Sequence, residues 1–84
     1  MVFEYRQIEI VIYGPEFRVF DYYTGRITTT PLPTTDPFLA IAKITTNMLN
    51  QLGIERWELV GYSSSSIANV YMFKRPLVAS SAVR

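Results

Sequence analysis

Alternating apolar and polar residues predict two groups of strands separated by a single helix. Near its start the chain is rich in Ile, Val, Tyr and Phe, the residue types that favour extended backbone. Two turns divide this part, at Gly14 with Pro15 and at Thr24 with Gly25, because glycine permits turn dihedrals and proline cannot donate to a sheet ladder. The predicted strands cover residues 2–13, 17–23 and 26–30. We expect an antiparallel meander whose short, threonine-rich third strand is an edge exposed to water.

The long first strand changes phase along its length. Phe3 and Tyr5 stand at odd positions, whereas the isoleucines that follow stand at positions 8, 10 and 12. A β-bulge near Arg6 and Gln7 would bring both sets to one face of the sheet. Alternatively, the strand is unbroken and lies at the centre of the sheet, with both of its faces partly covered. The pattern favours the two arrangements equally.

A helix follows a stiff, proline-rich connector at residues 30–37. The connector is extended, because a residue that precedes proline is pushed away from helical dihedrals. Asp36 is placed to cap the helix N-terminus, with Pro37 at the first helical position. Gly53 is expected to end the helix in a left-handed conformation. Spacings of three and four residues predict the face that packs on the sheet: Phe38, Ile41, Met48, Leu49 and Leu52, with Thr45 in the same stripe.

Two further strands, at residues 57–62 and 69–75, are joined by a serine-rich loop at 63–66. The pattern therefore predicts an α+β domain over residues 1–76. It is an antiparallel sheet of four or five strands in the order β-β-β-α-β-β, with one amphipathic helix packed on one face. Residues 77–84 are a C-terminal tail that we expect to be flexible or docked on a partner. The predicted core consists of Ile8, Ile10, Ile12, Phe38, Ile41, Met48, Leu52, Trp57, Leu59 and Val70.

Two motifs resemble a family of small bacterial domains, the one designated domain of unknown function 4177. The first is L-N-Q-L-G-I-E-R-W-E-L-V after the helix stripe, and the second is Y-M-F-K-R-P in the last strand. Glu4, Tyr5 and Arg6 match the E-Y-K-type strand of such domains. The chain departs from the family pattern at Arg56, where these domains usually carry glycine, and in its Pro/Thr-rich segment 28–36. The resemblance implies a fold and no established activity or site residues.

The composition argues against catalysis and against a bound metal or cofactor. The chain contains no cysteine and no histidine, which removes thiolate nucleophiles, Ser-His-Asp devices and the commonest zinc ligands. The carboxylates of Glu9, Asp21 and Glu58 show no paired spacing, and the serines at 63–66 have no visible base to activate them. We therefore expect a protein that is not an enzyme and that uses no cofactor or metal.

Neither a secretion signal nor a membrane span is expected. The first residues lack a basic leader followed by an apolar core. No apolar run approaches the roughly 20 residues that a membrane-spanning helix needs. We expect a cytoplasmic protein that does not insert into a membrane.

Aromatic residues make up 14% of the chain, and this favours an interaction or assembly module. One helix cannot cover a whole sheet, so the aromatic open face or an edge strand would bind another protein or a second copy of this chain. The alternative is a small domain that binds nucleic acid or an anionic ligand through sheet aromatics and arginines, Arg18 among them. A net charge of +1 and the lack of an RNP-like motif weigh against that alternative. The candidate interaction residues are Tyr5, Arg6, Tyr22, Arg26, Tyr62, Tyr71, Lys74 and Arg75.

Overall fold

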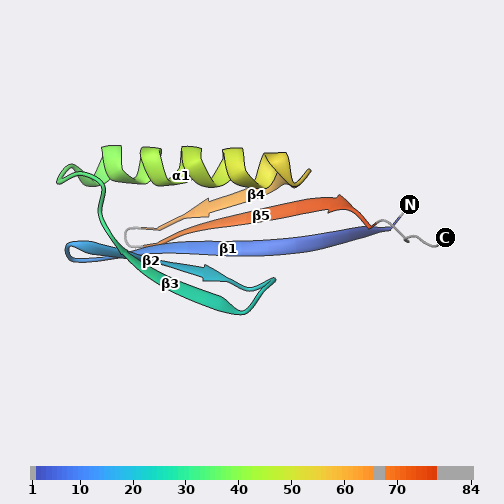
Figure 1. Cartoon of the computed structure of the whole chain (residues 1–84), viewed down its shortest axis with the longest axis horizontal. Coiled ribbons are helices and arrows are strands. Elements are labelled where there is room, and N and C mark those ends of the chain that lie inside the picture. Colours follow the sequence, from blue (N-terminus) through green and yellow to red (C-terminus); the bar gives the residue numbers. More distant parts are fainter. Residues whose placement is uncertain (1, 66–67, 78–84) are drawn as a thin grey trace.

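The computed structural model describes residues 2–65 and 68–77, and within them the chain forms one five-stranded antiparallel sheet and one helix (Figure 1). The elements are β1 (Phe3–Tyr13), β2 (Glu16–Asp21), β3 (Arg26–Pro31), α1 (Pro37–Ile54), β4 (Glu58–Ser64) and β5 (Ala68–Pro76). The strands are arranged in the sheet as β3-β2-β1-β5-β4. The predicted α+β fold with one helix on one face is confirmed. The predicted tail lies outside the described residues, except for Leu77.

Strand β1 is the centre of the sheet, between β2 and β5. Its ladder with β5 has no register shift from Phe3 to Val11. The phase change in the sequence therefore reflects an unbroken central strand, and the bulge considered near Arg6 is wrong. The described sheet has its irregularity in β4 instead, between Leu59 and Gly61. Even-numbered residues of β1 face the helix, and odd-numbered ones face away from it.

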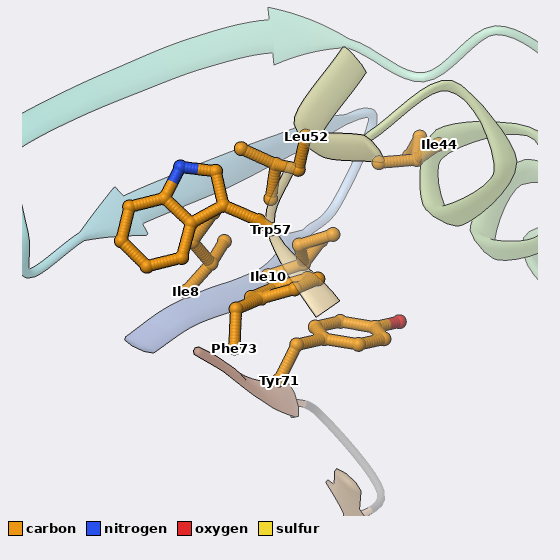
Figure 2. Packing of buried hydrophobic residues seen from close by; sticks show 7 residues of the cluster. All are labelled: Ile8, Ile10, Ile44, Leu52, Trp57, Tyr71 and Phe73. Atoms are coloured by element: carbon orange, nitrogen blue, oxygen red, sulfur yellow. The ribbon is translucent and has the colours of Figure 1, made fainter. Parts of the chain in front are cut away.

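Alternation gives the sheet a covered face beneath α1 and an open face on the other side (Figure 1). On the covered face, side chains of β1 and β5 pack against the helix and against Trp57, which follows the helix C-terminus. The core cluster consists of Ile8, Ile10, Ile44, Leu52, Trp57, Tyr71 and Phe73 (Figure 2). Partly buried side chains pack around this cluster: Phe17, Val19, Leu32, Ile41, Met48 and Leu49.

Four predicted core residues lie outside the core. Ile12 belongs neither to the core cluster nor to the side chains packed around it, and it lines a cleft at one end of the sheet. Phe38 is 87% exposed, because the first turn of α1 lies over this cleft of about 360 Å³. Leu59 is 40% exposed on the edge strand β4. Val70 pairs with Glu9 on the open face, so its neighbours in β5 take the buried positions. The predicted parity of β5 was therefore wrong by one residue.

The turn chemistry before the helix agrees with the sequence. Gly14 has a φ of +59° and precedes Pro15, as a two-residue hairpin between β1 and β2 requires. The Asp36 side chain caps α1, where its Oδ1 accepts from the backbone N–H groups of Phe38 (2.9 Å) and Leu39 (3.4 Å). These bonds satisfy donors that a helix N-terminus otherwise leaves free.

The C-terminus of α1 differs from the prediction. The helix runs through Gly53 to a cap at Glu55, and Arg56 carries the left-handed φ of +69°. The N–H of Arg56 donates to the Gly53 carbonyl, and the N–H of Trp57 donates to the Leu52 carbonyl, both at 2.9 Å. This pair of bonds is a Schellman motif, which is completed by the contact of Trp57 with Leu52 in the core. The extra helical residues allow the tryptophan to reach that core.

Candidate interaction site

The eight candidate residues do not share one surface. Tyr5, Tyr22 and Lys74 lie on the open face, whereas the side chains of Arg6 and Arg75 lie on the covered face. Arg26 lies on the edge strand β3, at the opposite edge of the sheet from Tyr62 on β4. Tyr62 pairs directly with Tyr71 of β5, and their ring centres are 5.3 Å apart. The structure therefore divides the candidates between an exposed aromatic face, two sheet edges and a cluster around Trp57.

The open face carries large apolar side chains that no described element covers. Tyr5, Tyr22 and Ile27 are 59%, 58% and 62% exposed, and Tyr13 is 46% exposed. Val11 is the exception at 7%; it lies between Arg18 of β2 and Ala68 of β5 in the ladders of the sheet. Sequence reasoning missed Ile27 and Tyr13. Alternation across the two predicted turns places odd-numbered residues of β1 and β3 on the same face as Tyr5, and this was the signal for both.

The charges of the open face are engaged with its aromatic rings. The Arg18 guanidinium lies 4.3 Å from the centre of the Tyr13 ring, and Lys74 Nζ lies 4.4 Å from that of Phe3. The Tyr22 hydroxyl donates to Glu9 at 2.9 Å, and this bond raises the pKa of Tyr22. The open face is therefore mainly aromatic. Its cationic groups lie over aromatic rings, and the Tyr22 hydroxyl is hydrogen-bonded to Glu9.

On the covered face Arg75 stacks on Trp57, with the guanidinium carbon 4.2 Å from the indole centre. Its Nε donates to Glu4 at 2.8 Å, and a terminal nitrogen donates to the Glu55 carbonyl at 2.9 Å. The Tyr23 hydroxyl donates to the other Glu4 oxygen at 2.7 Å. This hydrogen bond, followed by the one from Arg75, lowers the pKa of Glu4. Arg75 is therefore held by its own domain.

Arg6 is held on the same side of the sheet. Its guanidinium forms a bidentate ion pair with Asp21 and lies 3.7 Å from a Glu55 carboxylate oxygen. The same group lies 5.2 Å from the ring centre of Tyr23 and 5.5 Å from that of Trp57. Burial raises the pKa of Asp21, but the hydrogen bonds and charge of Arg6, with hydrogen bonds from the backbone N–H groups of Tyr23 and Thr24, outweigh this effect, so the pKa is lowered. The side chain of Arg6 is 13% exposed and is committed to this cluster.

The two remaining tyrosines differ in access. Tyr71 is 2% exposed, and its hydroxyl shares a hydrogen bond of 2.6 Å with Thr45 of α1. Burial raises the pKa of Tyr71, and we assign the residue to the core rather than to a contact surface. Tyr62 is 59% exposed, and its hydroxyl donates to the Asn69 side chain at 3.1 Å.

Among residues 2–65 and 68–77, no group of His, Cys, Asp and Glu side chains is arranged to hold a metal ion. Within the same ranges, the helix α1 is not long and apolar enough to cross a membrane. No family model, curated protein or solved structure matches this chain. The resemblance to the domain of unknown function 4177 family stays a prediction.

Proposed function

We propose that this domain is a non-catalytic interaction module that binds another protein, or a second copy of itself, through the open face and the adjoining edge strand β3. The observation that carries the proposal is the exposure of Tyr5, Tyr22 and Ile27 on a face that no described element covers. A tyrosine offers a large contact area with little side-chain entropy to lose, which is why tyrosine often anchors interfaces. Full burial of one such apolar side chain contributes roughly 1.5–3 kcal/mol.

The distribution of cations supports protein binding over nucleic-acid binding. Base stacking on Tyr5 and Tyr22 would need cations beside them to hold phosphates. Of the cations on the open face, Lys74, which pairs opposite Tyr5, lies over the Phe3 ring, and Arg18 lies over the Tyr13 ring. Arg6 and Arg75 lie on the opposite face, where Asp21 and Glu4 pair with them. The net charge of +1 provides little long-range attraction to a polyanion.

Site-specific photo-crosslinking tests the proposal. A benzophenone amino acid replaces Tyr22 on the open face, and in a matched variant it replaces Phe38, which is 87% exposed on α1. The expected result is a discrete cross-linked product, with itself or with a protein of the native host, from position 22 and not from position 38. Equal cross-linking from both positions, or none from position 22 together with a monomer in sedimentation, would overturn the proposal.

A further inference from the structure

Building on the proposed interaction role, we infer that the partner at the β3 edge is a second copy of this chain. The two β3 strands pair antiparallel about a twofold axis at Thr29, which joins two five-stranded sheets into one. The inference rests on the state of the two sheet edges, on the backbone groups that β3 leaves unpaired, and on the charge pattern of the strand.

The two edge strands of the described sheet differ in how readily they can pair with a strand of another chain. Strand β4 is interrupted between Leu59 and Gly61, and a bulge at an edge discourages pairing with another strand. The ladder of β2 with β3 is unbroken along β3, and every residue of β3 is exposed. Within β3 only Arg26 carries a charge, and it stands at the end of the strand. The β3 edge is therefore regular, and the residues that oppose edge pairing, Arg26 and Pro31, stand at its two ends.

The ladder determines which backbone groups of β3 point outward. The Leu32 N–H donates to the Pro15 carbonyl at 2.9 Å, and these residues continue the register of β2 and β3. Because hydrogen-bonded and non-bonded pairs alternate in an antiparallel ladder, Thr28 and Thr30 bond to β2. The groups that point away from the sheet are the N–H and C=O of Ile27, the N–H and C=O of Thr29, and the C=O of Pro31.

A twofold axis at Thr29 matches these groups. Thr29 of each copy exchanges two hydrogen bonds with Thr29 of the other, and each Ile27 N–H meets the Pro31 carbonyl of the other copy. The missing N–H of Pro31 thus falls at the outer end of the ladder. On the open face, Ile27, which is 62% exposed, packs against Pro31 of the second copy.

The charges of β3 are compatible with a second copy as occupant. Residues from Ile27 to Pro31 are uncharged, so no like charges face each other across the axis. Arg26 of each copy falls opposite Leu32 of the other, beside a groove of about 260 Å³ that Asn47 and Pro33 help to line. The two arginines lie six strand positions apart, about 20 Å. This exceeds the Debye length of about 8 Å at physiological salt, so their repulsion is screened.

A single cysteine tests the register directly, because the chain contains none of its own. In Thr29→Cys the two sulfurs face each other across a pair with Cα atoms about 5.5 Å apart, which lies within disulfide reach. Thr46→Cys, on the exposed side of α1, is the matched control for random collision. We expect Thr29→Cys to form a covalent dimer under mild oxidation and Thr46→Cys to remain monomeric. Faster cross-linking of Thr28→Cys than of Thr29→Cys, or equal cross-linking of Thr46→Cys, would overturn the inferred pairing.

Thr29→Pro tests the hydrogen bonds. The Thr29 N–H faces outward, so proline leaves the ladder with β2 intact while it removes the two central bonds of the dimer. At about 1 kcal/mol per bond, the dissociation constant of the dimer in sedimentation should rise about thirtyfold. If Thr29→Pro fails to fold, Thr29→Lys places like charges across the axis and should likewise weaken the dimer. An unchanged dimer in the folded variant refutes β3 pairing.

The outcomes separate this inference from the proposed function. A wild-type monomer at high concentration refutes the second copy as partner. If the benzophenone at position 22 then captures a different protein at a discrete site, the interaction role stands without self-pairing. If it captures nothing, both proposals fail.

Discussion

Replacement of Arg56 by glycine should stabilise the domain. Arg56 is the only non-glycine residue with positive φ among the described residues, at +69°, and it occupies the left-handed position of the Schellman motif. Its side chain forms no hydrogen bond or ion pair within the described part of the chain. The substitution therefore relieves backbone strain without removing a side-chain hydrogen bond or ion pair in the described part of the chain.

The magnitude follows from two opposing terms. A residue with a Cβ pays about 1–2 kcal/mol in the left-handed region. Glycine also raises the conformational entropy of the unfolded chain, and this offsets about 0.4–1 kcal/mol of the stabilisation. The net gain for Arg56→Gly is therefore about 0.5–1 kcal/mol, which corresponds to a rise of about 4 °C in Tm for a domain of this size.

Thermal and urea unfolding followed by circular dichroism measure the gain. Arg56→Ala is the matched control, because it removes the side chain but keeps the Cβ, and it should give no stabilisation. Gly53→Ala probes the same helix end: the added methyl meets nothing within 4 Å, so alanine should stabilise by about 1 kcal/mol. Loss of stability in both Arg56→Gly and Gly53→Ala would show that Gly53, not Arg56, is the left-handed residue.

Two further predictions concern the covered face. Because the folded-state pKa values of Glu4 and Asp21 are lowered, both carboxylates contribute stability that is present at neutral pH and lost as the pH falls through those values, below about pH 4.5. The urea midpoint should fall over that range, and a Glu4→Gln, Asp21→Asn variant should show a shallower decline; an equal slope would contradict the assignment. Thr45→Val leaves the buried Tyr71 hydroxyl without its partner and should cost about 1–3 kcal/mol in urea unfolding. Adding Tyr71→Phe should restore part of that loss, and a strictly additive double variant would refute the coupling.

Local patterns were sufficient to predict the elements of this fold. Turn residues and alternation located the strands, and Asp36 with Pro37 located the helix start, because these signals act within a few residues. The parity of β5 was not decided in this way, since Val70 and Met72 are as apolar as Tyr71 and Phe73, with which they alternate. Only the pairing of β5 with β1, more than fifty residues away, determines which set faces the helix.

The candidate site was harder to predict, for a related reason. A single sequence shows the arginines at positions 6 and 75 but not their partners. Arg75 pairs with Glu4 across 71 residues, and Arg6 pairs with Asp21 in the adjacent strand. The exposed tyrosines of the open face, in contrast, follow from alternation in the meander, although Tyr5 and Tyr22 were predicted from aromatic content, together with Tyr62 and Tyr71. Long-range ion pairing thus removes Arg6 and Arg75 from the accessible candidates, and packing in the core removes Tyr71.

The central position of β1 has a consequence for how the chain reaches its native state. Along one edge β1 pairs with β5, from Phe3 to Val11. Contacts at the middle of the sheet therefore have a large sequence separation, which slows folding. During synthesis β1 and α1 emerge well before Tyr71 and Phe73, which belong to the core cluster that the helix packs on. Until they arrive, Ile8 and Ile10 have no partner strand on that side and are open to chaperones or to aggregation. A nascent chain halted before Ala68 would lack β5, and with it Tyr71 and Phe73 of the core cluster.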